Sequence, residues 1–289
     1  MRNLMSERAC VYALALAILS ILSANIGKSH AATQDGPEEV DRSFLETVDG
    51  VSFDMVYVEG GSFMMGGGAE EPVHEVVLSP YFMMSMEVTQ ELWNAVMPDV
   101  DIYALRDREV DISKAHGEPD DYALPVHKVG PDYPVYYVCY AHALEFCKRL
   151  SRITGRRYSL PTEAQWEYAA RGRTGVTEFS GSQISEEVAW SAGNSGGHVH
   201  KVGTLKPNSL GIYDMSGNVL EWCQDRYLPY EEGSQADPLT ASSVPGSDIV
   251  CRGGGWKSRP SECAVHCRYE GHINFGDDAM GFRVVCAAE

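Results

Sequence analysis

Helical periodicity is sparse in this 289-residue chain, and that scarcity constrains the fold more than any other feature. The strongest helical pattern covers residues 141–153, where apolar side chains recur at three-residue steps and Gly155 follows as a stop signal. The apolar positions of this predicted helix are Leu144, Cys147, Leu150 and Ile153. Few helices in so long a chain favour a mixed architecture of helices, short strands and loops.

Two shorter helices are predicted from their N-terminal caps. Thr89 precedes a stretch, ending near residue 96, whose apolar residues fall on one helical face. Those apolar residues are Leu92, Trp93 and Val96. Thr162 and Gln165 have capping-box spacing, which predicts a helix over 162–171.

Short apolar runs punctuated by glycine predict strands elsewhere. The segment 51–65 is typical of two strands around a turn, and 76–86 of one further strand. Three more strands are predicted near the C-terminus, at 249–251, 264–267 and 281–285. The acidic segment 97–134 lacks periodicity and predicts a surface loop. Together these patterns predict an irregular α+β domain.

The N-terminal residues 1–32 have the order of a signal peptide, with Arg2 and Arg8 before an apolar stretch and small residues around Ala32. The apolar stretch is too short to persist as a membrane anchor, so a retained membrane helix is the weaker alternative. We therefore expect a secreted or periplasmic protein without a stable membrane anchor. A flexible lead-in is predicted over 33–50 and one domain over 51–289.

The net charge of −18 excludes a nucleic-acid partner, because binding to phosphate backbones depends on cations. Cysteine usage gives a second constraint. Seven cysteines follow the predicted signal peptide, and in an oxidising compartment such residues are expected to pair. The odd number leaves at least one without a partner in the chain, and the absence of a CxxC motif argues against a zinc ribbon.

Six ordered blocks resemble the formylglycine-generating enzyme, or sulfatase-modifying factor, family. The blocks are FMMG at 63–66, EVT at 87–89 with Trp93, LPTEAQWEYAARG at 160–172, NSLGIYDMSGNVLEW at 208–222, RGGGW at 252–256 and GFR at 281–283. The family includes pyoverdine-maturation and ergothioneine-forming relatives as well as non-catalytic paralogues. The resemblance implies a C-type-lectin-like fold with little regular secondary structure over 51–289.

Most residues of these blocks have structural roles by their chemistry. Large aromatic side chains with polar tips suit a core that lacks long helices, namely Trp166, Tyr168, Trp222 and Trp256. Arginines in the same blocks are predicted to pair with buried acids, since a guanidinium satisfies several acceptors at once. The arginines are Arg171, Arg252 and Arg283, and the acids are Glu163, Glu167 and Glu221.

The resemblance implies one structural Ca²⁺ site. Its ligands here would be Asp214, Gly217, Val219 and Glu221, a mixture of carboxylate and carbonyl oxygens that Ca²⁺ prefers. The loop that aligns with the second calcium site of the family, 194–200, offers no carboxylate. Its two histidines, His198 and His200, leave a transition metal as an alternative, although two histidines are a weak signal.

Copper chemistry is predicted to be absent. The resemblance implies a serine and two copper-binding cysteines, and the corresponding positions here are Gly255, Ser258 and Cys263. A hydroxyl does not replace a thiolate as a ligand for a soft ion, so formylglycine formation by the copper route is not expected. Cys263 is instead assigned to a disulfide. The pairs considered are Cys147–Cys286, as in the family, Cys223–Cys263 and Cys251–Cys267, which leave Cys139 single.

Two functional hypotheses stay open at this point. The first is an oxidoreductase that tailors a peptide-like or siderophore-like substrate, with Glu262, His266 and Cys263 as catalytic candidates. The second is a non-catalytic module that binds a ligand or a protein on the same fold. In the alternative interpretation of the site, Glu262 forms a surface pair with Arg259. Authentic formylglycine formation is a third hypothesis, and Ser258 argues against it.

Overall fold

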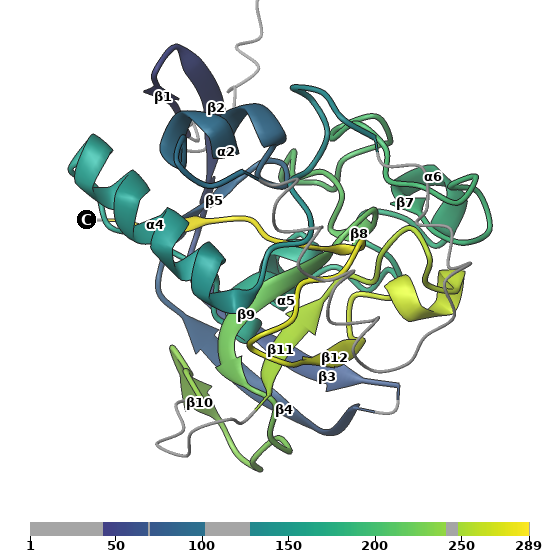
Figure 1. Cartoon of the computed structure of the whole chain (residues 1–289). Coiled ribbons are helices and arrows are strands. Elements are labelled where there is room, and N and C mark those ends of the chain that lie inside the picture. Colours follow the sequence, from purple (N-terminus) through teal and green to yellow (C-terminus); the bar gives the residue numbers. More distant parts are fainter. Residues whose placement is uncertain (1–42, 69, 102–127, 241–247, 289) are drawn as a thin grey trace, which may run out of the picture. The chain divides into compact units, whose positions relative to one another are not determined.

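A five-stranded sheet brings together the first and last described strands of the chain. In this computed structural model, which describes residues 43–68, 70–101, 128–240 and 248–288, the sheet has the order β1-β2-β5-β14-β6. Its strands β1, β2 and β5 are labelled in Figure 1. Its strands are β1 (Phe44–Val48), β2 (Val51–Val58), β5 (Tyr81–Met84), β14 (Val285–Ala287) and β6 (Tyr158–Ser159), all antiparallel. Strand β1 lies inside the segment that the sequence assigned to a flexible lead-in, so the folded part begins by Phe44. The predicted signal peptide lies outside the described residues.

Three smaller sheets complete the β-structure. A four-stranded sheet has the order β12-β11-β9-β13, formed by β12 (Arg268–Gly271), β11 (Ile249–Arg252), β9 (Leu220–Arg226) and β13 (Met280–Gly281). A three-stranded sheet contains β10 (Gln235–Ala236), β4 (Glu70–Leu78) and β3 (Gly61–Gly67). The pair β7 (Ala189–Trp190) and β8 (Ser216–Gly217) is parallel. Because few strands exceed seven residues, loops carry much of the chain between them.

The three predicted helices are confirmed, with their caps. They are α2 (Gln90–Val96), α4 (Tyr140–Thr154) and α5 (Glu163–Ala170), and α6 (Ser185–Val188) and the 3-10 turn η1 (Pro260–Cys263) are additional. Thr89 caps α2 through a hydrogen bond from Leu92 N. Thr162 and Gln165 form the expected capping box on α5. Gly155 ends α4 in the left-handed conformation at φ 77°.

Four of the sequence-based details are wrong. The strand predicted over 281–285 is interrupted, because Gly281 ends β13, Val285 begins β14, and residues 282–284 lie outside both strands. The strand predicted over 76–86 is two strands, β4 and β5, because Pro80 lies between them and cannot donate to a ladder. The strand predicted over 264–267 is a turn after η1. Helix α4 buries a different face: Leu144 and Ile153 are 42% and 53% exposed, and the buried residues are Ala143, Phe146, Cys147 and Leu150.

Two large apolar clusters form the core. One lies between α2, α4 and the five-stranded sheet, where Trp93 stacks on Phe146 with ring centroids 5.9 Å apart. The other surrounds Trp166 and Tyr168 of α5 and joins β3, β4, β9 and β11. The predicted aromatic core residues are thus confirmed, including Trp222 and Trp256. Within the described segments, no helix has both the length and the apolar character needed to cross a membrane.

Candidate functional site

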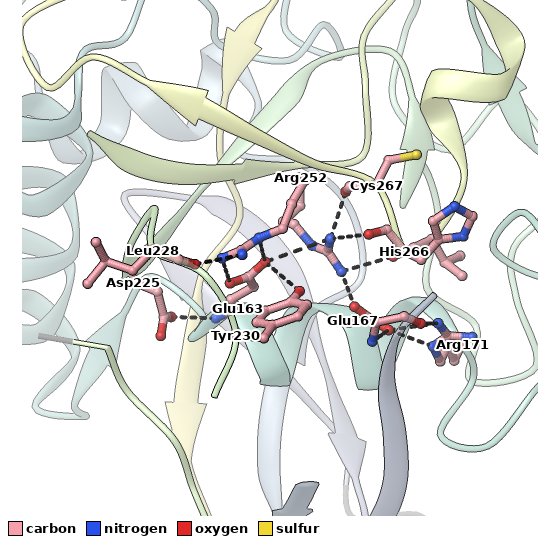
Figure 2. A network of polar contacts seen from close by, with 12 residues as sticks. Glu163, Glu167, Arg171, Asp225, Leu228, Tyr230, Arg252, His266 and Cys267 are labelled. Atoms are coloured by element: carbon pink, nitrogen blue, oxygen red, sulfur yellow. Dashed lines mark hydrogen bonds and ion pairs between the residues drawn. The ribbon is translucent and has the colours of Figure 1, made fainter. Parts of the chain in front are cut away.

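Helix α5 holds the first of two buried ion networks. Glu163 and Glu167 are four residues apart and therefore lie on the same helical face, turned toward Arg252 and Arg268. The Glu163 carboxylate receives Nε and Nη2 of Arg268 at 2.8 and 2.7 Å, and Tyr230 Oη at 3.0 Å. Figure 2 shows Glu163, Tyr230 and Asp225 on one side of this network and Glu167, Arg171 and His266 on the other. The network fixes α5 against the four-stranded sheet.

Arg252 links both halves of this network. Its guanidinium pairs with Glu167 and also donates to the main-chain carbonyls of Val265, His266 and Cys267 at 3.0, 2.8 and 2.7 Å. Arg171 adds a second cation to Glu167, with 2.7 Å between Nη2 and Oε1. The predicted pairing of Arg171 and Arg252 with α5 acids is confirmed. A charge-assisted network of this kind sets the position of the whole loop after η1.

A cavity of about 390 Å³ opens beside the Glu163–Arg268 pair. Its lining combines charged, polar and apolar residues: Met65, His74, Glu163, Ala164, Asp225, Leu228, Pro229, Tyr230, Glu231, Gln235, Ala236, Pro238, Leu239, Thr240 and Arg268. Arg268 lies between the rings of Tyr227 and Tyr230, 4.8 and 4.1 Å from their centroids. The volume suits a small ligand or a single side chain of a peptide.

Asp225 is the unusual group of this cavity. Only 3% of the residue is exposed, and its carboxylate accepts main-chain N–H groups of Glu163 and Thr240 at 2.6 and 2.8 Å. No lysine or arginine forms an ion pair with it among the described residues. Burial raises the pKa of Asp225 to about 6, and the hydrogen bonds only partly oppose this. A buried carboxyl of this kind on a cavity wall marks a candidate binding site.

The three predicted catalytic residues do not converge. Glu262 is held by Arg259, with 2.7 Å between Oε1 and Nη2, and these hydrogen bonds lower the pKa of Glu262. His266 packs over Gly68 at the end of β3, where any side chain would collide with its ring. Burial lowers the pKa of His266, and no hydrogen bond joins it to Glu262. The alternative interpretation of Glu262 and Arg259 as a surface pair matches this geometry.

Cys263 is inaccessible to a substrate. It is buried beneath Gly254, where a Cβ atom would lie 2.8 Å from the Cys263 sulfur. Burial raises the pKa of this thiol to about 12, so the thiolate needed for nucleophilic attack is scarce at neutral pH. Its position in the turn beside Gly254 is therefore that of a packed core residue.

The positions that correspond to the copper site do not fit copper. The hydroxyl of Ser258 accepts the Gly255 N–H at 3.0 Å, and Ser258 N returns a bond to Gly255 O at 2.9 Å. The reciprocal bonds close a tight turn around Trp256. One protonated thiol and one committed hydroxyl are a poor donor set for a soft cation.

The second ion network includes the predicted calcium ligands. Glu221 of β9 pairs with Arg283 through two contacts of 2.7 Å and accepts the Trp166 indole N–H at 2.8 Å. Asp214, at φ 55°, accepts the N–H of Gly203 at 2.6 Å. The Glu87 carboxyl group accepts the main-chain N–H of Val219 at 3.0 Å. Burial, together with the nearby Asp214 and Glu221, raises the pKa of Glu87 well above its usual value.

Three buried carboxyl groups thus surround one guanidinium in this network. Among the described residues only Oδ2 of Asp214 accepts a hydrogen bond, so its Oδ1 would be available to a hard cation such as Ca²⁺. Glu221, in contrast, already has both oxygens bound by Arg283. No set of three or more His, Cys, Asp or Glu side chains in the described part of the chain is arranged to hold a metal ion. Calcium here would rely on main-chain carbonyls in addition to Asp214.

The structure joins none of the seven described cysteines to another in a disulfide. Of the three predicted pairs, only Cys147 and Cys286 lie in the same apolar cluster. Cys223 and Cys263 belong to different clusters, as do Cys251 and Cys267. The Cys147–Cys286 bond stays a prediction, and the packing disfavours the other two.

Comparisons with known proteins agree with this architecture. A family model described as "Sulfatase-modifying factor enzyme 1-like domain" matches residues 46–288. The serine/threonine-protein kinase pkn1 of Chlamydia pneumoniae is 31% identical over 244 residues, which are 80% of this chain but only 37% of that protein. The formylglycine-generating enzyme of Streptomyces coelicolor is 26% identical over 307 residues, or 88% of this chain and 93% of the enzyme.

Among solved structures, Treponema denticola variable protein 1 superposes with a TM-score of 0.71 at 27% identity. The match covers 86% of this chain and 99% of that one. The predicted α+β fold with few helices is confirmed by this similarity.

Proposed function

The chain belongs to the family of sulfatase-modifying factor enzyme 1-like domains, and on that premise we propose that it is a non-catalytic binding module for a cationic ligand. The ligand is an amine, free or on the side chain of a peptide, held in the cavity beside Glu163 and Arg268. The observation that carries the proposal is Asp225, a buried carboxyl without an ion-pair partner among the described residues.

The charge balance of the cavity selects the ligand. Arg268 is neutralised by Glu163, and its third nitrogen, Nη1, donates to Leu228 O at 2.8 Å. Asp225 and the exposed Glu231 then leave the lining with unbalanced negative charge. An ammonium group would supply the missing cation. Because hydrogen bonds already hold the site in place, little conformational entropy would be lost on binding.

The test is calorimetric titration with Nα-acetyl-lysine amide and with its Nε-acetylated counterpart, which lacks the charge. We expect binding of the first and none of the second, and loss of binding in Asp225→Asn. Glu231→Gln changes an exposed rim residue without disturbing the fold, and should weaken binding several-fold. Asp132→Asn, which removes a surface pair with Lys201 outside the cavity, is the control. Equal binding of the charged and the Nε-acetylated lysine derivative would refute the proposal.

A second candidate function, oxidative tailoring, is favoured by the similarity to the Streptomyces coelicolor enzyme over 88% of this chain. Its substrate would be peptide-like or siderophore-like. This candidate requires a reactive group other than Cys263, because the Cys263 thiol is buried and Ser258 is bound within its turn. Conversion of a substrate by the purified protein would distinguish it from the binding module.

A further inference from the structure

A cysteine and a histidine meet at the start of the longest helix, away from the cavity. Cys139 is the N-cap residue of α4, and its sulfur lies 3.2 Å from Nδ1 of His142 in the first turn. The His142 ring lies nearly perpendicular to the ring of Trp93, with 6.5 Å between ring centroids. Nucleophile and base are therefore within hydrogen-bond reach, the arrangement by which proteins activate a thiol.

Cys139 differs from the other cysteines in its surroundings. It is half-buried, whereas Cys147, Cys223, Cys251 and Cys263 are buried in apolar clusters that raise their pKa values. At Cys139 burial also opposes ionisation. The His142 ring and the main-chain N–H groups of His142 and Ala141 outweigh it, so the pKa of this thiol falls below its usual value.

The neighbouring loop does not cancel this effect. Its Gly276 packs against the main chain of Val138 and Cys139, and the acids that follow it, Asp277 and Asp278, are both paired with Lys257. The positive end of the 15-residue helix α4 also favours a thiolate at its N-cap.

We propose that Cys139 and His142 form a site of thiol–disulfide exchange with low-molecular-weight disulfides. The Cys139 thiolate attacks one sulfur of the disulfide, a new sulfur–sulfur bond forms at Cys139, and the old one breaks. The departing thiolate takes up a proton, and His142 holds the proton that Cys139 releases. A second small thiol reverses the reaction, so the modification is reversible. This site is independent of the amine-binding cavity.

Two substitutions test the pair without disturbing the helix. Cys139→Ser keeps a good N-cap residue, and His142→Gln places a capping-box residue three positions later. Cys267→Ser alters the other half-exposed cysteine and is the control. The full chain, reduced beforehand, is mixed with 5,5′-dithiobis(2-nitrobenzoate) in a stopped-flow instrument between pH 5.5 and 9.

We expect one thiol to react about ten-fold faster than the rest at pH 7, because attack follows the thiolate fraction. Cys139→Ser should remove the fast phase, and Cys267→Ser should retain it. His142→Gln should slow the phase several-fold below pH 7 and shift its pH profile upward. Glutathione disulfide should add one glutathione at Cys139 by peptide mass mapping. A fast phase that survives Cys139→Ser, or a pH profile unchanged by His142→Gln, would overturn the proposal.

Discussion

The ionisation of Asp225 has a measurable effect on stability. Its pKa of about 6 in the fold exceeds the unperturbed value of 3.8, so the folded state holds a proton that the unfolded chain releases between these values. The stabilisation is therefore present below about pH 4 and lost as pH rises through 6. Relative to Asp225→Asn, we expect the wild type to lose about 3 kcal/mol of unfolding free energy between pH 4 and 7.

Urea unfolding of both proteins at several pH values measures this difference. The subtraction cancels the other carboxylates, which are common to both chains. A constant difference across the range would contradict the assignment. Saturating amine ligand should remove the pH dependence above pH 5, because a bound cation lowers the pKa of the carboxyl.

The calcium prediction is tested with two substitutions, one that breaks the Glu221–Arg283 ion pair and one that removes only a predicted calcium ligand. Glu221→Ala leaves Arg283 buried without its partner and should cost about 3–5 kcal/mol whether or not calcium is present. Asp214→Asn preserves that pair but removes a carboxylate. We expect the wild-type melting temperature to fall on addition of EGTA and that of Asp214→Asn to be insensitive. Identical wild-type melting curves with and without EGTA would eliminate calcium binding.

Some site residues were predictable from the sequence and others were not. The Arg–Glu pairs were predictable because arginines and glutamates occur beside large apolar residues in the same sequence blocks, and a buried ion needs a partner of opposite charge. Convergence of Glu262 with His266 failed because Arg259, three residues before Glu262, binds the carboxylate locally. Asp225 was missed, since its isolation depends on loops that close around it. The available sign was weak, because Asp225 follows Gln224 in a strand, β9, that already contains other charged residues.

At the scale of elements, local signals were reliable and long-range ones were not. The capping box of α5 and the left-handed Gly155 depend on neighbours within four residues, so the sequence specifies them. The buried face of α4 depends on the angle at which it meets the sheet, and the three-residue steps pointed to Leu144 and Ile153 in error. Residues 264–267 have strand-like composition, yet Pro260 starts a 3-10 turn whose continuation excludes a ladder.

A disulfide between α4 and β14 is the prediction at this scale. Cys147 and Cys286 share an apolar cluster, and oxidation would close a loop of more than 130 residues. For a loop of this length the chain-entropy relation gives about 5 kcal/mol of added stability. Mass mapping of the air-oxidised protein under non-reducing conditions should recover this pair, with Cys147→Ala and Cys286→Ala each lowering the melting temperature equally. Recovery of a Cys223–Cys263 disulfide instead would contradict this prediction, because those two cysteines lie in different apolar clusters.

At the scale of the whole molecule, the net charge of −18 acts together with the cavity. An acidic surface attracts cations and repels nucleic acid, and its influence declines as salt screens it. The same field would draw an amine toward Asp225. Membership of the family therefore accounts for the fold. The chemistry of this chain depends instead on its charged residues and on the replacement of a copper-binding cysteine by Ser258.

The final prediction concerns the chemistry that the family name suggests. Because Ser258 is bound to Gly255 and Cys263 is a buried thiol, we expect neither tight copper(I) binding nor oxidation of a substrate cysteine. Copper(I) titration against a competing chelator, followed by mass spectrometry of a cysteine-containing sulfatase peptide in air, measures both. The Streptomyces coelicolor enzyme is the positive control, and Ser258→Cys restores a second sulfur for comparison. Wild-type copper binding with loss of the peptide thiol would show that formylglycine formation survives these substitutions, and the binding-module proposal would then fall.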